Sequence, residues 1–324
     1  MKARHDFEAI LHRRVAEVIG TDDIITRLKS GKQLRIKYGI DPTSTSFHLG
    51  HTIPLRKLRE FQDMGHIGVF IIGDFTAQIG DPTGKSDTRN MLTLQQTQEN
   101  AKKYVEFASK IIDMEKTEIH FQSEWYDKMS LEQTIRLMAT VTKEQLMRHE
   151  TFRIRDRENK PLGFHEMFYT LLMAFDSVKV KSDIELGGPD QKFNFLITRQ
   201  VMERFGLMAE DVILMKFLSG TDGAEKMSKS GDNFIGIDEN PKMQFEKIMK
   251  IPDGRIIEFF DLATSLSIKE INDIILSLTS NKLHPIAAKR MLALSIVSDC
   301  HGKIRAQSED DDFFKAHPQL RKLL

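Results

Sequence analysis

The hydrophobic pattern of the first part of the chain alternates between helical and strand-like periods. Residues 7–29 carry apolar side chains at helical spacing, and residues 34–40 read as a buried strand. Helical spacing returns over residues 50–64, where Gly65 is a typical helix stop, and the apolar run at 67–73 predicts a second buried strand. Strand, helix and strand in this order predict a parallel βαβ unit.

Two connecting segments, residues 39–51 and 73–89, leave the carboxyl ends of these predicted strands. Ligands of parallel sheets collect at the carboxyl ends of the strands. Both segments are therefore expected to line one crevice.

The remaining pattern is mainly helical. It predicts helices at 92–115, 131–150 and 164–180 and a short strand at 183–186. Beyond about residue 235, short amphipathic helices are separated by Pro241, Pro252 and Pro285, which favours a separate helical domain. The expected fold class is α/β, with a parallel sheet followed by a smaller helical domain.

Composition narrows the possible partners. The chain has 324 residues, of which 40% are apolar, and its 47 Lys and Arg balance its 47 Asp and Glu. Any nucleic acid must therefore be held by local basic patches. A single cysteine, Cys300, excludes an internal disulfide and fits a reducing compartment. The charged N-terminus and the lack of a run of about 18 apolar residues predict a soluble, cytoplasmic protein without a membrane partner.

The stretch IGDPTGKSD, residues 79–87, looks like a phosphate-binding loop. That pattern requires a first glycine five residues before Gly84, where this chain has Ile79. Pro82 removes an amide from the middle of the loop, and Asp81 would repel a phosphate. The segment is instead predicted to be a turn that presents the Asp81 carboxylate to a cationic group such as an ammonium.

A second candidate site is HLGH, residues 48–51, at the junction of the first strand and its helix. Helix N-termini attract anions, and imidazole N–H groups can donate to phosphate oxygens. Gly50 between His48 and His51 lets a ligand approach the backbone. A zinc site would need a third ligand that the pattern does not supply, and histidines that merely cap a helix remain an alternative.

A third candidate is KMSKS, residues 226–230, which is flanked by glycines and is expected to form a mobile loop. Lys226 and Lys229 could close over a triphosphate and stabilise charge on a leaving pyrophosphate. Two lysines at this spacing are, by themselves, more often simply solvated.

Together, HLGH and KMSKS resemble the paired signatures of the class I aminoacyl-tRNA synthetases. KMSKS matches that consensus at every position, and HLGH differs from HIGH only in its leucine. The stretches YGIDPTSTSFHLGH, GDFTAQIGDPTGKSDTR, FYTLLMAFDS and ELGGPDQKFNF resemble tyrosyl-tRNA synthetases from about residue 30 to about residue 310. This resemblance implies a Rossmann-like catalytic domain over residues 1–235 and a helical anticodon-side domain over residues 236–324.

The resemblance also assigns three groups of residues. The transition-state donors would be His48, His51, Lys226 and Lys229. The ATP-binding residues would be Gly39, Asp41, Thr43, Gly50, Gly188, Asp190 and Ser228. The amino-acid site would comprise Lys37, Asp81, Tyr169, Met173, Asp176 and Gln191, with Asp81 and Tyr169 at the ammonium and Asp176 at the phenol. The spacing of Tyr169 and Asp176 puts both on one helical face.

Two positions depart from the family pattern. Many members have a tyrosine that pairs with the substrate phenol where this chain has Lys37, although a lysine occurs in part of the family. Tyr38 should point to the opposite face of the strand. Met173 stands where a glutamine commonly reaches the ammonium, and a thioether makes only weak hydrogen bonds. Amine recognition would then depend on Asp81 and Tyr169.

The implied reaction has two steps. The carboxylate of tyrosine attacks the α-phosphate of ATP, which enters as a complex with Mg²⁺, and a terminal hydroxyl of tRNA(Tyr) then attacks the acyl carbon. No protein-bound metal and no DNA partner are expected. An insertion at about 118–165 would form a homodimer and approach the acceptor stem, where Arg148, Arg153 and Arg155 would make salt-sensitive phosphate contacts. Most bacterial members continue into a small RNA-binding domain, and this sequence ends where that domain would begin.

Two alternatives remain open at this point. A paralogue could activate a tyrosine-like amino acid for a pathway outside translation, which Met173 and the short C-terminus would favour. A non-catalytic RNA-binding homologue is the second alternative, although loss of catalysis should erode HLGH and KMSKS.

Overall fold

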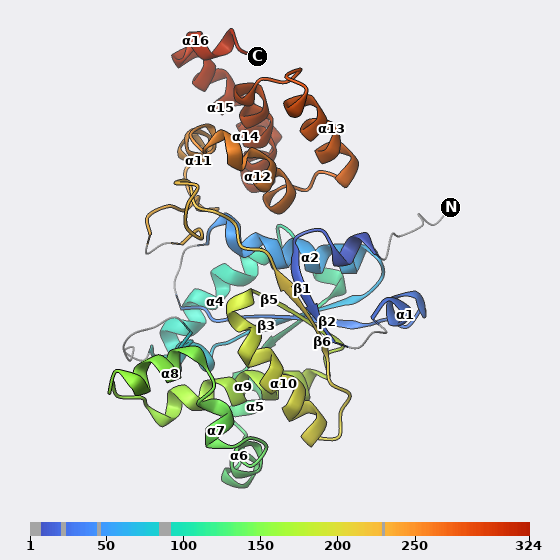
Figure 1. The fold of residues 1–324 in the computed structure, drawn as a ribbon, viewed down its shortest axis with the longest axis vertical. Coiled ribbons are helices and arrows are strands. Elements are labelled where there is room, and N and C mark those ends of the chain that lie inside the picture. The colour runs from blue at the N-terminus through green and yellow to red at the C-terminus, as the bar shows by residue number, and fades with distance from the viewer. Residues whose placement is uncertain (1–7, 21–23, 44–46, 84–91, 229–230) are drawn as a thin grey trace. The chain divides into compact units, whose positions relative to one another are not determined.

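The structure is a computed structural model that describes residues 8–20, 24–43, 47–83, 92–228 and 231–324. The chain divides into two compact units. Figure 1 colours the ribbon by residue number, from blue at the N-terminus to red at the C-terminus. The first unit comprises residues 1–45 and 57–215, and the second comprises residues 46–56 and 216–324. The division into functional domains at residue 235 remains a prediction.

The first unit is built on a six-stranded sheet in the order β1-β6-β5-β2-β3-β4. Its strands are β1 (Val15–Ile19), β2 (Arg35–Ile40), β3 (Ile67–Ile72), β4 (Thr117–Phe121), β5 (Ile184–Gly187) and β6 (Asp211–Met215). All neighbouring strands are parallel except β1, which runs antiparallel to β6 at one edge. The predicted α/β class and the parallel pairing of the first two expected strands are therefore confirmed.

The helix predicted over residues 7–29 is wrong. That segment forms a short 3-10 turn (Ala9–Leu11), strand β1 and helix α1 (Ile24–Lys29). The β1 sequence VAEVI is rich in β-branched residues, which favour an extended chain. Pairing with β6 supplies hydrogen-bond partners that a local helical pattern does not reveal.

Helices cover both faces of the sheet. The elements are α2 (Thr52–Asp63), α3 (Thr76–Ile79), α4 (Leu94–Ala108), α9 (Phe164–Val180) and α10 (Lys192–Arg204). Adjacent residues of β2 point to opposite faces: Lys37 bonds to Ser177 of α9, whereas Tyr38 stacks on Phe70 and lies near Tyr104 of α4. The central strands are buried on both faces, which explains their continuous apolar runs.

The segment between β4 and α9 differs in part from its prediction. It forms α5 (Ser123–Tyr126), α6 (Leu131–Met138), α7 (Lys143–Leu146) and α8 (Glu150–Arg157). The helical stretch expected over residues 131–150 is thus two short helices. The basic run 148–160 includes α8, and Arg155 fixes this helix through an ion pair with Glu166 of α9.

The second unit contains the helices expected after residue 235. They are α11 (Pro241–Met249), α12 (Ile256–Ala263), α13 (Ile268–Thr279), α14 (Pro285–His301), α15 (Lys303–Ala316) and α16 (Pro318–Arg321). Pro241, Pro285 and Pro318 each start a helix, where a missing N–H costs nothing. No helix among the described residues is long and apolar enough to cross a membrane.

Candidate active site

Acidic and phenolic side chains gather where β2 and β3 end. Asp41 follows β2, and Gly73 after β3 lies so close that a Cβ there would meet Asp41 Oδ1 at 2.1 Å. Thr76 donates to the same oxygen over 2.6 Å, and Tyr169 of α9 donates to Asp41 Oδ2 over 2.9 Å. The predicted proximity of the two strand-end segments is confirmed for these residues.

Asp81 lies in a turn, as the sequence predicted. It follows Gly80, whose φ of 83° favours glycine, and its Oδ1 accepts the backbone N–H of Thr83. Gln191 donates to Asp81 Oδ2 over 2.6 Å, so Gln191 and Asp81 are brought together as expected. Residues 84–91, which complete the phosphate-loop-like stretch, lie outside the described residues.

Burial raises the pKa of Asp41 to about 7, and the negative charge of Asp81 acts in the same direction. Hydrogen bonds from Thr76 and Tyr169 oppose this rise. Two carboxyl groups that repel each other favour a bound cation, which would stabilise both ionised forms. The family resemblance assigns Asp41 to ATP binding. In the structure, Asp41 accepts a hydrogen bond from Tyr169, which the resemblance assigns to the amino acid.

Asp41→Asn is expected to change the pH dependence of stability. The folded-state pKa of Asp41 is raised, so the folded protein holds this proton more tightly than the unfolded chain, and that advantage disappears as pH rises from about 4 to about 7. Relative to the variant, the wild type should lose up to about 1.4 kcal/mol of unfolding free energy per pH unit in this range. Urea unfolding of the ligand-free proteins from pH 4 to 8 measures this. Parallel stability curves for both proteins would contradict it.

A second carboxylate, Asp176 of α9, lies on the same helical face as Tyr169 and is buried. Gln122 donates to its Oδ2 over 2.6 Å, and Trp125 Nε1 and the Tyr126 hydroxyl lie 3.2 and 2.9 Å from its Oδ1. Burial raises the pKa of Asp176 to about 6, while the charge of Lys37 and the donors Gln122 and Tyr126 restrain the rise. Asp176 is therefore a carboxylate held by neutral donors in an apolar setting.

One hydrogen-bonded chain joins the two carboxylates. Thr76 lies between Asp41 and Gln122: its hydroxyl is 2.6 Å from Asp41 Oδ1 and 2.8 Å from Gln122 Oε1. Gln122 also accepts the backbone N–H of Thr76 and donates to Asp176. The chain of contacts therefore runs from Tyr169 through Asp41, Thr76 and Gln122 to Asp176.

Sequence analysis missed Thr76, Gln122, Trp125 and Tyr126. A usable signal existed for Gln122, because it directly follows β4 and so leaves the carboxyl end of a parallel strand, as Asp41 does. In the β4 sequence TEIHF, Glu118 and His120 form one face and Thr117, Ile119 and Phe121 the other, an alternation typical of a strand. For Trp125 and Tyr126, only the tertiary structure shows that they face Asp176.

The other expected amino-acid residues lie nearby. Lys37 is buried below α9, and its Nζ is 3.4 Å from the backbone carbonyl of Met173. Met173 is half-buried and packs against the apolar cluster of Phe195, Val212 and Leu214. Its side chain therefore has apolar neighbours.

The ATP-side residues of the first unit lie at strand ends. Gly39 is exposed near the end of β2, and Thr43 follows two residues after Asp41. Gly188 caps the 3-10 turn Pro189–Gln191 after β5, and Asp190 in that turn is exposed. These positions share the carboxyl edge of the sheet.

The HLGH motif belongs to the second unit and begins the helical run that continues as α2. His48 Nδ1 accepts the N–H of Gly50, and His51 Nδ1 accepts the N–H of His48, both over 3.2 Å. In a neutral ring, accepting at Nδ1 leaves the proton on Nε2. Both rings, whose centroids are 3.9 Å apart, are thus fixed as Nε2–H donors.

The KMSKS segment belongs to the same unit. Leu49 N–H donates to the carbonyl of Ile235, and His48 pairs with Gly236, so HLGH is joined to the residues that follow KMSKS. Met227 is buried, whereas Lys226 is exposed with Nζ 3.7 Å from the centre of the Phe217 ring.

Asn233 fixes the beginning of this segment. Its side chain accepts the Ser228 N–H and donates to Asp222, both over 2.9 Å. Lys229 and Ser230 lie outside the described residues.

The basic residues expected at tRNA differ in exposure. Arg148 and Arg153 are exposed, whereas Arg155 is only 1% exposed and pairs with Glu166 at 2.8 Å. This ion pair joins α8 to α9. Arg155 is therefore not proposed to contact a tRNA phosphate.

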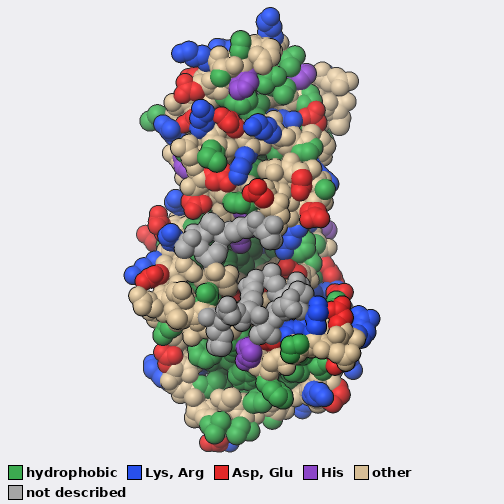
Figure 2. All heavy atoms as spheres, turned by 90° about the vertical axis from the view of Figure 1, so that its left-hand side faces the viewer, with side chains coloured by type: hydrophobic (Ala, Val, Ile, Leu, Met, Phe, Trp, Pro, Cys, Tyr) green, Lys and Arg blue, Asp and Glu red, His purple; other side chains and the backbone are tan. Residues whose placement is uncertain are grey.

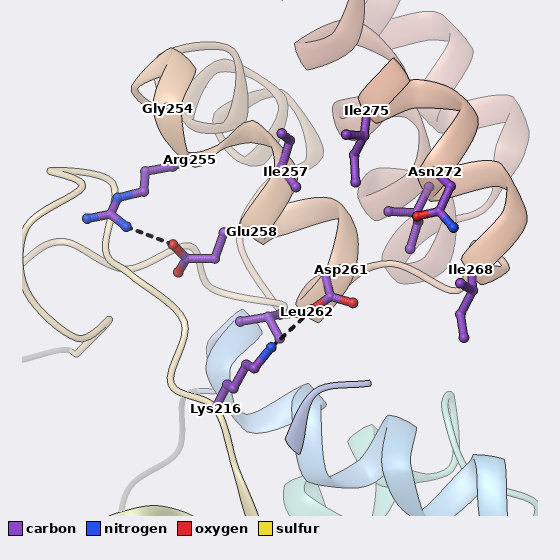
Figure 3. A pocket seen from close by; sticks show the side chains of 11 residues that line it. Lys216, Gly254, Arg255, Ile257, Glu258, Asp261, Leu262, Ile268, Asn272 and Ile275 are labelled. Carbon is purple, nitrogen blue, oxygen red and sulfur yellow. Dashed lines mark hydrogen bonds and ion pairs between the residues drawn. The ribbon is translucent and has the colours of Figure 1, made fainter. Parts of the chain in front are cut away.

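A separate pocket of about 500 Å³ lies in the second unit (Figure 3). It is lined by residues of α12 and α13 together with Lys216, Gly254 and Arg255. Its charged side chains pair with each other, Lys216 with Asp261 at 3.9 Å and Arg255 with Glu258 at 3.1 Å. None of its lining residues belongs to the expected site. In the described part of the chain, no group of three or more His, Cys, Asp or Glu side chains is arranged to hold a metal ion.

The comparisons with known proteins agree on one family. Residues 29–315 match the family described as tRNA synthetases class I (W and Y). The tyrosine–tRNA ligase of Carboxydothermus hydrogenoformans is 44% identical over 310 residues, covering 94% of this chain and 75% of that protein. That of Dehalococcoides mccartyi is 44% identical over 312 residues, covering 96% and 79%.

Solved structures share the fold. A tyrosyl-tRNA synthetase of Archaeoglobus fulgidus, complexed with L-tyrosine, superposes with a TM-score of 0.74 at 20% identity, covering 94% of this chain and 98% of that one. A C-terminally truncated mitochondrial tyrosyl-tRNA synthetase of Aspergillus nidulans gives 0.79 at 20% identity, covering 96% and 92%. Fold, motifs and sequence identity lead to one conclusion: the chain belongs to the class I tRNA synthetases of the tyrosine and tryptophan group, as a member of the tyrosine–tRNA ligase family.

Proposed function

We propose that this chain activates tyrosine with ATP and transfers the tyrosyl group to tRNA(Tyr). The proposal rests on one face of α9, where two polar groups of different character lie two turns apart. Asp41 and Asp81 surround Tyr169 at one end and suit an ammonium, while Asp176 lies two turns away among apolar and aromatic side chains and suits a phenol hydroxyl. Tyrosine carries both groups.

Asp176 is suited to accept the phenol. A carboxylate offers about four acceptor positions, and Oδ2 of Asp176 accepts one hydrogen bond, from Gln122, so it has capacity for another. At the other end, Asp81 and Tyr169 hold the substrate ammonium and orient its carboxylate. Phenylalanine would leave the Asp176 carboxylate buried without its last donor, which discriminates strongly against it.

Activation is an in-line displacement. A carboxylate oxygen of tyrosine forms a bond to the α-phosphorus, the bond to the bridging oxygen breaks, and pyrophosphate leaves. The Nε2–H groups of His48 and His51 and the ammonium groups of Lys226 and Lys229 stabilise the developing negative charge. Mg²⁺ enters with ATP as part of the substrate. In the second step, a terminal hydroxyl of the tRNA attacks the acyl carbon and AMP leaves.

The ATP contacts are assigned to backbone and small polar groups. They are Gly39, Asp41, Thr43, Gly50, Gly188, Asp190 and Ser228. Asp190 is exposed at the carboxyl edge of the sheet and is assigned to the ribose. Arg148 and Arg153, which are exposed, are assigned to tRNA phosphates. A cytoplasmic location and a functional boundary between residues 235 and 236 belong to the same proposal.

Pyrophosphate exchange into ATP tests the first step. Tyrosine, phenylalanine and tyrosine analogues are supplied one at a time, and charging of tRNA(Tyr) is measured next. Strong exchange with tyrosine supports the proposal. Exchange only with another amino acid would make Met173 a specificity residue and favour the paralogue, because its apolar packing replaces an amide at the ammonium end. No exchange with any of them would overturn the proposal.

A homodimer formed through residues 118–165 is part of the proposal. Leu131, Ile135 and Met138 form one apolar face of α6 and are 75%, 57% and 52% exposed, and Phe164 is 90% exposed. Figure 2 shows hydrophobic side chains gathered at the lower end of the face it presents. An exposed apolar patch of this kind is typical of a protein–protein interface.

Leu131→Asp with Ile135→Asp is expected to convert the dimer into a monomer. Charges buried at an apolar interface without partners are strongly unfavourable. Light scattering coupled to size exclusion measures the mass, and Arg136→Gln, on another face of α6, is the control that should remain dimeric. A wild-type protein that is monomeric at micromolar concentration would contradict the assignment of this face.

A further inference from the structure

A buried lysine, Lys37, contacts α9, the helix that carries Asp176. Lys37 of β2 is 1% exposed, and its Nζ is 2.7 Å from Ser177 Oγ and 2.7 Å from Glu185 Oε1. The carbonyl of Met173, one turn earlier in α9, lies 3.4 Å from the same nitrogen. The ammonium therefore makes hydrogen bonds to Ser177 and Met173 and an ion pair with Glu185, all within the protein interior.

Carboxyl groups surround this cation from three other elements. Asp176 belongs to α9, Glu185 to β5, and Glu210 directly precedes β6. All three are buried, and Ser177 lies within 3.4 Å of Glu185 and 3.3 Å of Glu210. Ser182 donates to the other oxygen of Glu210. Lys37 is thus the cation of a closed group of buried acids.

The protonation states follow from the surroundings. Burial, reinforced by the charge of Glu185, raises the pKa of Glu210 well above its usual value, which favours the neutral acid. Burial alone would lower the pKa of Lys37, but the charges of Glu185, Glu210 and Asp176 outweigh it and raise the pKa instead. The group then contains Lys37 as a cation, Glu185 as its direct partner, and Asp176 as the second carboxylate facing the same cation.

We infer that Lys37 selects for a phenolic substrate indirectly: its ammonium anchors the Asp176 turn of α9 and supplies the positive charge that keeps the buried Asp176 carboxylate ionised. The inference rests on the proposed role of Asp176 as the phenol acceptor. Lys37 is a positioning residue, because it acts through Asp176 and Ser177 and does not itself contact the amino acid.

The positive charge of Lys37 matters because Asp176 is proposed to accept a hydrogen bond from the substrate phenol. Gln122, Trp125 and Tyr126 are neutral donors, so none of them supplies a positive charge to the buried carboxylate. An ionised carboxylate accepts a phenol hydrogen in a charge-assisted bond, which is about twice as strong as a neutral one. Among the described residues, the ionisable groups besides Lys37 that interact with Asp176 are acids: Glu185, Asp41, and the phenols of Tyr126 and Tyr169.

The test compares Lys37→Met with the double variant Lys37→Met/Glu185→Gln. The double variant removes both members of the ion pair, so that Glu185 is not left as an unpaired buried charge, and thermal unfolding verifies that it folds. KM for tyrosine and for phenylalanine is measured by pyrophosphate exchange from pH 6 to pH 9. Lys37→Arg, which retains the cation, and Asp176→Asn, which removes the acceptor, complete the set.

The expected result is a change in pH profile. At pH 7 the KM for tyrosine should rise about 10-fold in Lys37→Met, because a rise of about two units in the pKa of Asp176, from about 6, leaves only about one carboxyl group in ten ionised. The rise should be smaller in Lys37→Met/Glu185→Gln, because the charge of Glu185 itself raises the pKa of Asp176. The KM should return toward the wild-type value near pH 9, where Asp176 ionises again. The KM for phenylalanine should stay constant, and Lys37→Arg should restore the wild-type profile.

Three outcomes would overturn the inference. An unchanged KM for tyrosine in a folded Lys37→Met protein would show that Asp176 needs no help from Lys37. A rise by the same factor at every pH would indicate a direct contact or a purely structural role. Unchanged discrimination in Asp176→Asn would remove the phenol acceptor on which the inference rests, whereas a wild type that activates no tyrosine would instead overturn the proposed function.

Discussion

Asp176→Asn is expected to lower kcat/KM for tyrosine activation by at least about 1000-fold. The replacement puts an amide where three donors converge, from Gln122, Trp125 and Tyr126. One end of the amide is itself a donor, so it loses the hydrogen bond to the phenol and leaves a neighbouring donor buried without an acceptor. The unsatisfied group should also destabilise the protein by about 1–3 kcal/mol.

The measurement separates recognition from stability. Pyrophosphate exchange with saturating ATP gives kcat/KM for tyrosine and phenylalanine, and urea unfolding gives stability on the same preparations. Activation of phenylalanine should fall much less than activation of tyrosine. Asp156→Asn, an exposed position of α8, is the matched control and should behave as the wild type. A loss below 10-fold for tyrosine, with an unchanged ratio to phenylalanine, would place the phenol elsewhere.

His48→Ala is expected to lower kcat of the activation step by about 100–1000-fold, the effect of removing one pre-oriented donor to a transition-state charge. The hydrogen bond from Gly50 to Nδ1 fixes the ring with its proton on Nε2, so the donor is oriented before ATP binds. Such a donor acts mainly on the transition state. KM for tyrosine and ATP should therefore change by less than about 3-fold.

Single-turnover formation of tyrosyl-adenylate is the measurement that isolates this step. His12→Ala, at an exposed histidine of the first unit, is the control. Equal losses in kcat and in substrate affinity would indicate that His48 binds the ground state or supports the fold. A rate within a few-fold of wild type would assign the transition-state charge to His51 and the lysines alone.

The residues assigned in the proposal fall in different units. Asp41, Asp81, Tyr169 and Asp176, which are proposed to bind the amino acid, belong to the first unit, while HLGH and KMSKS belong to the second. Substitutions at Asp176 should therefore alter which amino acid is used, whereas substitutions at His48 should alter how fast any amino acid reacts.

Much of this site was predictable because its signals are local in sequence. The parallel βαβ unit followed from two strand-like segments, 34–40 and 67–73, on either side of a segment of helical period, and the strand-end rule placed Asp41 and Asp81 at the same edge of the sheet. HLGH and KMSKS combine residue types that phosphate chemistry needs at fixed short spacings.

Other features depended on contacts between residues far apart in the chain. The strand β1 exists because β6 offers hydrogen-bond partners about 200 residues later, and Arg155 became a structural residue because Glu166 neutralises it in a buried position. The roles of Gln122, Trp125 and Tyr126 appear only once β4 and α5 lie against α9.

Lys37 shows most clearly what the sequence determines and what only the tertiary structure decides. The sequence by itself determined that a lysine stands in a buried strand, at a position where many family members have a tyrosine. Only the tertiary structure decided that Glu185 would pair with it and that Asp176 and Glu210 would share its charge. The physical reason is that periodicity reports local backbone geometry, whereas the ionisation and partners of a buried charge depend on which distant groups the fold places within a few ångströms of it.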